Sequence, residues 1–207
     1  MERLKDLIKE GEHQTQDFKF RIDDQKKIAR TLAAFANTDG GRLLIGVKDS
    51  GKIAGINPEE EFHMIQGAAQ MFCKPPVSIE SRIWQEDMRL VLEIMVEPNG
   101  KRNHTALDDG GKWKIFIRRK DQTLLANKII LKVWDFERQG IKKPQIFGDQ
   151  ELKCLKLIEE SQPVTLSKTY RLLDLPKSVT DHIVALLVHW KIIEMEITEE
   201  GTYYKTI

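Results

Sequence analysis

The chain has 207 residues, 41% of them hydrophobic, so it can bury a core as one medium domain or as a domain plus a small module. No segment approaches the roughly 18 apolar residues that a membrane span needs, and the N-terminus lacks the apolar stretch of a signal peptide. We therefore expect a cytoplasmic protein without a membrane partner, although the net charge of +1 alone favours no class of partner.

The N-terminal part of the chain predicts a strand, a helix and a second strand. Residues 17–21 alternate between apolar and charged side chains, as in a strand with one solvated face. The alanine-rich stretch 25–38 predicts a helix that packs closely against a sheet, and the glycine pair at 40–41 ends it. The continuous apolar run 43–47 predicts a strand that is buried on both faces.

Further helices and strands follow up to residue 138. Residues 58–72 predict a helix that begins with proline and three acids. Three segments, 77–83, 90–96 and 113–118, alternate as strands do, and residues 127–138 predict a closing amphipathic helix. Helices set among antiparallel strands indicate an α+β domain.

The C-terminal part has a different plan. Residues 141–148 are typical of a linker. Three short helices and a β-hairpin follow within residues 149–207, and this order indicates a winged helix-turn-helix. We therefore predict an α+β domain over residues 1–140, a linker over 141–148, and a smaller winged helix-turn-helix domain over 149–207.

Charge is distributed unevenly along the chain. Residues 149–207 contain 7 Lys+Arg against 10 Asp+Glu, a net charge of −3, which leaves +4 for the rest. Residues 99–120 contain seven basic residues and only two acids, Asp108 and Asp109. We call the seven the basic band: Lys101, Arg102, Lys112, Lys114, Arg118, Arg119 and Lys120. Such a band is typical of a surface that binds a polyanion, and a solvated sheet face is the alternative.

The predicted nucleic-acid contacts come from three places: the basic band, the first strand, and the start of the third C-terminal helix. They are Lys19, Arg21, Lys101, Arg102, Lys112, Lys114, Arg118, Arg119, Lys120, Lys177, Ser178 and Thr180. Because phosphate neutralisation supplies most non-specific affinity, the acidic C-terminal module is a poor DNA clamp by itself. It reads DNA locally, acts within a dimer, or contacts protein, and the sequence leaves these three roles open.

Several motifs together resemble a known family. They are Asp17-Phe18-Lys19, Ala34-Phe35-Ala36-Asn37-Thr38-Asp39-Gly40-Gly41, Ile45-Gly46-Val47-Lys48-Asp49-Ser50-Gly51 and Trp113-Lys114-Ile115-Phe116-Ile117-Arg118-Arg119-Lys120. Over roughly residues 7–137 the chain resembles the Schlafen-type AlbA-like domain. The resemblance implies an α+β fold and nucleic-acid binding, because bacterial members are often described as DNA-binding or transcriptional-regulator proteins. Such members often carry a C-terminal winged helix, and some are labelled divergent AAA ATPases.

In nuclease-active Schlafen members, three acids near these motifs hold a divalent metal and cut RNA. The resemblance places them at Glu12, Asp17 and Asp49, where the second acid is usually a glutamate. Clustered carboxylates can hold Mg²⁺ or Mn²⁺, which activates water and stabilises a phosphoryl transition state. The alternative is structural: a strand-surface charge, a turn residue, and an acid that follows a glycine break.

Other chemistry has weaker signals. No phosphate-binding loop with its lysine is present, so the glycine pair at 40–41 either approaches a phosphate through its N–H groups or ends the helix. Cys73 and Cys154 lie in apolar contexts, which favours buried free thiols over a disulfide or a metal site.

The preferred function is a nucleic-acid-binding protein, with DNA as its ligand and transcriptional regulation as its role. In this interpretation the protein is a homodimer, is not an enzyme and requires no cofactor. The alternative is a metal-dependent endoribonuclease of Schlafen type that uses Mg or Mn at Glu12, Asp17 and Asp49.

Overall fold

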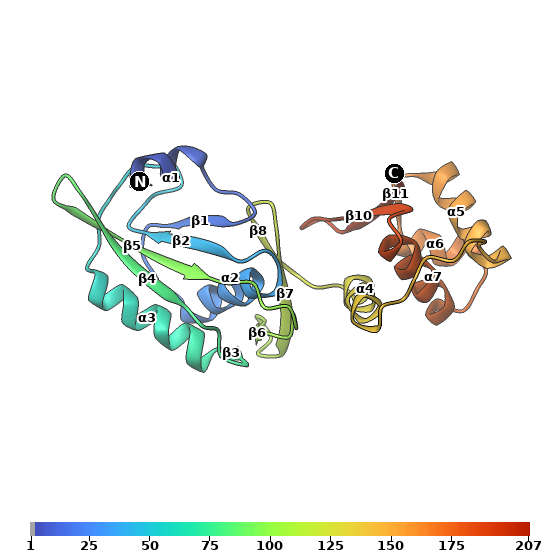
Figure 1. The fold of residues 1–207 in the computed structure, drawn as a ribbon, viewed down its shortest axis with the longest axis horizontal. Helices are drawn as coiled ribbons and strands as arrows, with labels where there is room; N and C mark the ends of the chain where they lie inside the picture. Colours follow the sequence, from blue (N-terminus) through green and yellow to red (C-terminus); the bar gives the residue numbers. More distant parts are fainter. Residues whose placement is uncertain (1–2) are drawn as a thin grey trace. The chain divides into compact units, whose positions relative to one another are not determined.

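The computed structural model describes residues 3–207 and divides the chain into two compact units (Figure 1). The N-terminal unit is Met1–Leu125 and the C-terminal unit is Ala126–Ile207. Over the described residues, none of the helices is long and apolar enough to cross a membrane.

The N-terminal unit is a mixed α+β domain, as predicted. Its elements are α1 (Leu4–Glu10), β1 (Gln16–Lys19), α2 (Gln25–Asn37), β2 (Gly41–Ile45), α3 (Pro58–Met71), β3 (Cys73–Lys74), β4 (Glu80–Glu86), β5 (Arg89–Val96), β6 (Thr105–Leu107), β7 (Trp113–Arg119) and β8 (Gln122–Leu125). They form two four-stranded sheets, in the orders β1-β2-β5-β4 and β3-β6-β7-β8. Only β1 and β2 run parallel, and the other pairs are antiparallel.

Helix α2 lies at the centre of this unit and contributes to the packing of both sheets. The Asp24 side chain accepts from the backbone N–H groups of Lys26 and Lys27 and so begins the helix. Its small alanine side chains are fully buried in a core that also contains Leu43 of the first sheet and Phe116 of the second. Close packing of this kind explains why the stretch is so rich in alanine.

The glycine pair after α2 is required by close packing. Gly40 has φ +72°, and a Cβ at this position would lie 2.7 Å from the carbonyl oxygen of Val96. A Cβ on Gly41 would lie 2.5 Å from the ring of Phe35. The N–H of Gly40 donates to the Phe35 carbonyl, so this amide is already bonded within the helix end. The geometry is that of a helix end followed by a strand, and it supports the helix-end interpretation of the pair.

The other face of the first sheet is covered by α1. Leu4 and Leu7 of α1 are buried against Phe18, Leu44 and Val91, which form a separate small core. Trp84 of β4 packs against the same core, and Lys5 of α1 forms an ion pair with Glu86 of β4, so α1 lies over this face of the sheet (Figure 1).

The C-terminal unit contains four helices and a small antiparallel sheet. Its elements are α4 (Lys128–Gln139), α5 (Asp149–Ser161), β9 (Val164–Thr165), α6 (Leu166–Leu173), α7 (Lys177–His189), β10 (Ile193–Ile197) and β11 (Thr202–Thr206). The sheet order is β10-β11-β9. Cys154, Ile158, Val184 and Leu187 are buried together in its core.

Helix α4 belongs to the C-terminal unit, which differs from the predicted boundary at residue 140. Ile129, Val133 and Phe136 join the core formed by α5, α6 and α7. The apolar face of an amphipathic helix can be buried against either neighbour, and the local sequence pattern does not say which.

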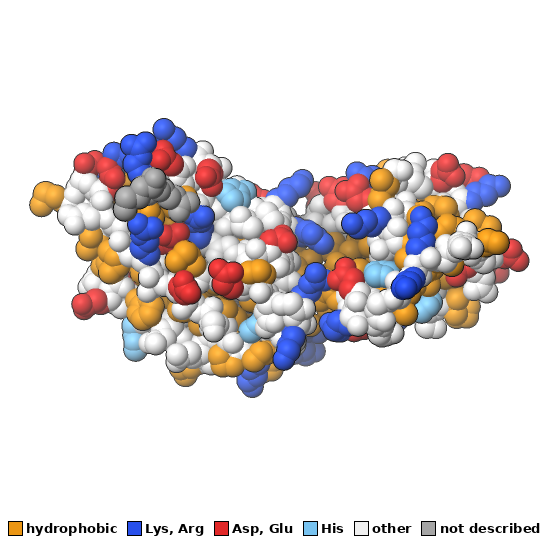
Figure 2. All heavy atoms as spheres, in the orientation of Figure 1, with side chains coloured by type: hydrophobic (Ala, Val, Ile, Leu, Met, Phe, Trp, Pro, Cys, Tyr) orange, Lys and Arg blue, Asp and Glu red, His pale blue; other side chains and the backbone are white. Residues whose placement is uncertain are grey.

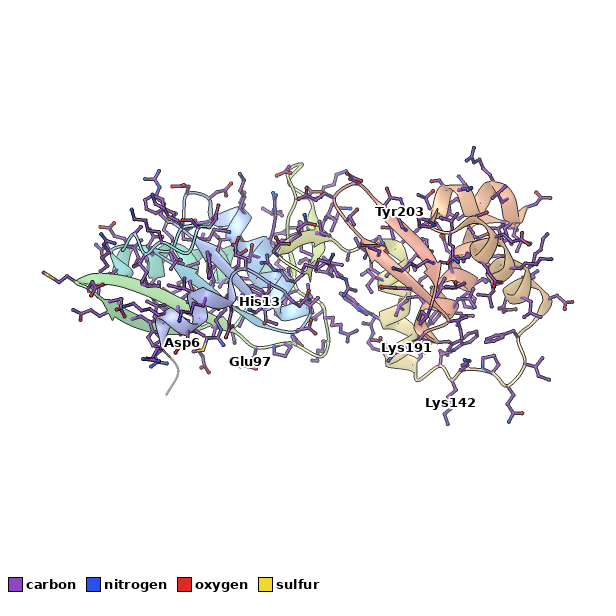
Figure 3. The ribbon with its side chains drawn as sticks, turned by 90° about the horizontal axis from the view of Figure 1, so that it is seen from above. Asp6, His13, Glu97, Lys142, Lys191 and Tyr203 are labelled. Atoms are coloured by element: carbon purple, nitrogen blue, oxygen red, sulfur yellow. The ribbon has the colours of Figure 1, made fainter. Side chains whose placement is uncertain are left out.

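The segment predicted as a linker, 141–148, is a loop inside the C-terminal unit. The carbonyl oxygen of Ile141 lies 2.7 Å from Nε2 of His189, and the Phe147 ring lies 5.6 Å from that of Trp190. Lys142 lies on this loop, which runs from α4 toward α5 (Figure 3). The loop therefore connects two helices of one core.

A cluster of three polar side chains, from half-exposed Lys128 to buried Asp181, connects α4 to α6 and α7. Lys128 Nζ lies 2.8 Å from Oδ2 of Asp181, and Tyr170 Oη bonds both to Lys128 and to Asp181. The hydrogen bonds that Lys128 donates to Asp181 and Tyr170 raise the pKa of Lys128. Phe136 of α4 also meets the rings of His182 and His189 on α7, with centroids 5.2 and 5.9 Å apart. The helix α7 is therefore covered along one side by α4.

Candidate nucleic-acid interface

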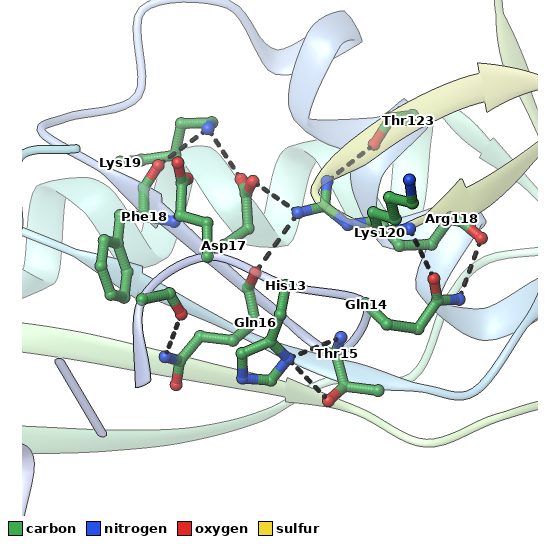
Figure 4. A network of polar contacts seen from close by, with 12 residues as sticks. His13, Gln14, Thr15, Gln16, Asp17, Phe18, Lys19, Arg118, Lys120 and Thr123 are labelled. Carbon is green, nitrogen blue, oxygen red and sulfur yellow. Dashed lines mark hydrogen bonds and ion pairs between the residues drawn. The ribbon is translucent and has the colours of Figure 1, made fainter. Parts of the chain in front are cut away.

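Asp17, one of the three predicted metal ligands, is buried and neutralised by two cations. Arg118 Nη2 lies 2.8 Å from its Oδ1, and Lys19 Nζ lies 2.7 Å from its Oδ2 (Figure 4). Both carboxylate oxygens are thus occupied by cations of the chain itself. A buried carboxylate requires such partners, because an unpaired charge in the interior is strongly disfavoured.

Glu12 lies near the other two acids but bonds to backbone. Its Oε1 accepts from the N–H of Phe18 at 2.9 Å. Burial is the main cause that raises the pKa of Glu12, and repulsion from Asp17 and Asp49 raises it further. The structure therefore brings Glu12 close enough to both other acids for their charges to interact.

The three acids do not fit a divalent metal site. Asp49 is exposed in a turn, Asp17 is held by Lys19 and Arg118, and Glu12 accepts from a backbone amide. Across residues 3–207, no group of three His, Cys, Asp or Glu side chains is arranged to hold a metal. Of the carboxylate oxygens that a hard cation prefers, both of Asp17 lie beside cations of the chain and one of Glu12 accepts from a backbone amide.

Arg118, a predicted phosphate contact, is buried and structural. Its guanidinium bonds to Asp17, to the carbonyl oxygen of Gln16 and to Thr123 Oγ1, and lies 5.2 Å from the centroid of the Phe35 ring. With 2% of its surface exposed, it cannot reach a ligand. It joins β7 of the second sheet to β1 of the first, which corrects its placement in the basic band.

The remaining predicted contacts differ in exposure. Thr180 is fully buried in α7, so its side chain cannot contact a nucleic acid. Lys19 and Arg21 are ion-paired, Lys19 with Asp17 and Arg21 with Asp23. Arg102 and Arg119 are half-buried. Within residues 3–207, the exposed members of the predicted set that form no ion pair are Lys101, Lys112, Lys114, Lys120, Lys177 and Ser178.

The hairpin of β6 and β7 presents uncompensated positive charge. The two acids of this region are used locally, because Asp109 pairs with Arg30 at 2.8 Å and Asp108 accepts from the backbone N–H of Lys112. Lys112 and Lys114 are exposed, and neither forms an ion pair with any residue in the range 3–207. Positive charge therefore remains at this end of the sheet.

Lys74 adds a cation that sequence reasoning missed. Its ammonium lies 4.2 Å from the centroid of the Trp113 ring, because β3 pairs with β6 and β6 pairs with β7. We define the basic hairpin surface as Lys74, Lys112, Trp113 and Lys114. Lysine and arginine side chains lie along this edge of the N-terminal unit, over β3, β6 and β7 (Figure 2). No local pattern identifies Lys74, because its partner Trp113 lies far from it in the sequence.

The asparagine of the Ala34–Gly41 motif is structural. Asn37 is fully buried, and its side-chain amide donates to the carbonyl oxygens of His104 and Phe116. Its Oδ1 accepts from the N–H of His104. The His104 ring is held in turn by Asn99 and by the carbonyl oxygen of Pro75. The motif therefore anchors α2 to β6 and β7 and places the basic hairpin surface.

The two cysteines are buried free thiols, as the sequence favoured. Burial raises the pKa of Cys73 and of Cys154 to about 12, so both remain protonated at neutral pH. Neither is suited to act as a nucleophile.

Comparison with known proteins gives a family match over most of the N-terminal unit. Residues 12–127 match the family model described as Schlafen, AlbA_2. No curated protein matches the chain. A crystal structure of the DIP2311 protein from Corynebacterium diphtheriae is 17% identical with a TM-score of 0.46, covering 92% of this chain and 38% of that one. The N-terminal domain of a RecG-related protein from Nitrosomonas europaea is 24% identical with a TM-score of 0.38, covering 47% of this chain and 74% of that one.

Proposed function

Because the chain belongs to the Schlafen, AlbA_2 family, we propose that it binds nucleic acid through its N-terminal unit, with DNA as the ligand and transcriptional regulation as the role. The observation that supports this most strongly is the basic hairpin surface. Three exposed lysines surround a half-exposed tryptophan there, and the nearby acids are engaged elsewhere.

This combination of side chains suits a nucleic acid for a physical reason. Lysines that lack carboxylate partners release counterions from the phosphate backbone, which supplies affinity for any sequence. An accessible aromatic ring provides a stacking surface for an unpaired base. A contribution of Trp113 to binding therefore distinguishes single-stranded from duplex DNA, because a duplex presents phosphates whereas a single strand also presents the faces of its bases.

The test is a charge reversal with a matched control. The variant K74E/K112E/K114E and the control K26E/K27E/K52E both lower the net charge by six within the N-terminal unit, and all six lysines are exposed. Binding of labelled duplex and single-stranded DNA is measured at several salt concentrations. Each lost phosphate contact lowers the slope of log K against log salt by about 0.9, so the first variant loses about 2.7 while the control keeps its slope.

Equal loss in both triple variants would show that net charge alone governs binding and would contradict this interface. Trp113→Ala then identifies the ligand. It weakens single-stranded binding by about 1–3 kcal/mol if a base stacks there, and leaves duplex binding unchanged.

For the C-terminal unit, we propose a winged helix whose α7 is not the principal contact with DNA. The order α5-β9-α6-α7-β10-β11 with a three-stranded sheet supports the winged-helix assignment. In that fold α7 takes the place of the recognition helix. Here α4 covers one side of α7 through Phe136, and Thr180 and Asp181 are buried. Truncation after Gln139 would destroy this core, so Lys177→Glu is the suitable test, and it should leave DNA affinity unchanged within about twofold.

The ribonuclease alternative is checked by the same titration. Adding Mn²⁺ to structured RNA should give no cleavage, because both oxygens of Asp17 are bound to cations. Metal-dependent cleavage that is lost in Asp49→Ala with the fold intact would replace the binding proposal with the nuclease.

A further inference from the structure

The first sheet of the N-terminal unit, β1-β2-β5-β4, has two outer edges, formed by β1 and β4. At the β1 edge every outward peptide group has a partner. The N–H of Gln16 donates to the His13 carbonyl, and the Gln16 carbonyl accepts from Arg118. The N–H of Phe18 donates to Glu12, and the Phe18 carbonyl accepts from Lys19. Side chains therefore close this edge to any further strand.

The β4 edge has no such cover. In the part of the chain that the structure describes, no hydrogen bond reaches the outward peptide groups of β4 from any other element. The strand is seven residues long, and Ile83 is 57% exposed on the face that bears α2 and α3. A long strand edge with free N–H and C=O groups and an exposed apolar side chain is a template for another strand.

We propose that β4 pairs antiparallel with β4 of a second copy of the chain, so that two sheets join into one across a two-fold axis. The axis passes through Trp84 and lies perpendicular to the sheet. In this register Arg82 lies opposite Glu86 of the second copy, and Glu86 lies opposite Arg82 of the second copy. Ile83 of each copy faces Gln85 and lies diagonal to the other Ile83 on the helix-bearing face.

Charge complementarity selects both the partner and the register. Arg82, Trp84 and Glu86 share one face of β4, because they lie opposite Glu93, Val91 and Arg89 of β5. Glu86 already pairs with Lys5 of α1 on this face, and Arg82 of the second copy would add a second cation to the same carboxylate. An axis through Arg82 would place arginine against arginine. An axis through Ile83 would place Glu80 against Glu86, and like charges directly opposite each other destabilise a strand pair. The register through Trp84 pairs opposite charges twice over five residues.

The proposal does not depend on the basic hairpin surface, which lies in the other sheet. Sedimentation velocity of the full chain is the measurement, from micromolar to submillimolar concentration. We expect a monomer–dimer equilibrium for the natural sequence. Arg82→Glu places two glutamates against two glutamates and should raise the dissociation constant at least about tenfold. Glu86→Arg should do the same, and the double reversal R82E/E86R should restore the dimer.

The control is K26E/K27E, which changes charge on α2 and should leave the dissociation constant unchanged. Circular dichroism confirms that each variant is folded. A natural sequence that stays monomeric throughout the concentration range would overturn the proposal and leave the edge to solvent or to a different chain. A dimer that R82E leaves intact, or that R82E/E86R fails to restore, would equally overturn it.

Discussion

The two edges of the first sheet differ in whether their outward peptide groups have hydrogen-bond partners within the chain. At β1, Glu12, Lys19 and Arg118 bond the outward peptide groups, while at β4 these groups are left to solvent or to a partner. The β1 edge is buried, and Arg118 of the second sheet contacts it. Its peptide groups must therefore find hydrogen-bond partners inside the chain. The peptide groups of the exposed β4 edge can bond to water when no other strand is paired with them. Glu12, one of the three acids predicted as a catalytic set, therefore also covers this buried edge.

The largest expected effect is the loss of Arg118. Arg118→Met leaves the buried Asp17 with Lys19 as its remaining cation and removes the bond to the Gln16 carbonyl. We expect a loss of about 3–5 kcal/mol in the free energy of unfolding, measured by urea denaturation. The double variant D17L/R118M should cost less than R118M alone, because it removes both charges. A loss below about 1 kcal/mol for R118M would show that Lys19 alone balances Asp17.

A smaller effect is expected at Glu12. Glu12→Ala leaves the N–H of Phe18 without its acceptor and should cost about 1–3 kcal/mol. Glu12→Gln keeps an oxygen acceptor at the same place and should cost less. Urea denaturation of both variants measures the difference. Equal costs would mean that the hydrogen bond to Phe18 contributes nothing and that the charge alone matters.

The pH dependence of stability tests the same residue. Burial raises the pKa of Glu12 above its ordinary value of 4.5, so the folded state binds this proton more tightly than the unfolded state. The contribution of Glu12 to stability should therefore fall as pH rises from that ordinary value through the raised pKa, and then stay constant. The free energy of unfolding of the natural chain minus that of Glu12→Gln should decrease across this interval. An increase would show that the pKa is lowered instead.

The smallest effect is expected at the open edge. Ile83→Thr replaces an exposed side chain by another good strand former and, at concentrations where the chain is monomeric, should change the free energy of unfolding by less than about 0.5 kcal/mol. The melting temperature of the natural chain should rise with protein concentration, and that of Arg82→Glu should not. A large loss in the monomer would mean that β4 is supported by contacts of its own.

Much of the fold could be predicted from local pattern. The α2 helix, the strands at 90–96 and 113–118, and the α+β class of the N-terminal unit are confirmed, and the strand predicted at 43–47 lies two residues earlier, at Gly41–Ile45. These features depend on neighbouring residues, namely the period of apolar side chains and the capping groups. The winged helix and the homodimer stay predictions.

The candidate site was harder to predict because it depends on long-range pairing. Arg118 and Asp17 are 101 residues apart in sequence and form one ion pair. From sequence, Arg118 belonged to a basic band and Asp17 to an acid trio. Their charges suggested a phosphate contact and a metal ligand, and only their approach shows that they neutralise each other.

The sequence by itself determined the helices, most strands and the regional charge, because these follow from side chains a few positions apart. The tertiary structure decided which charges face solvent. It buried Arg118 against Asp17, brought Lys74 to Trp113, and assigned α4 to the C-terminal unit. The physical reason is that burial and ion pairing are properties of groups that meet in space, and strand register and helix packing decide which groups meet.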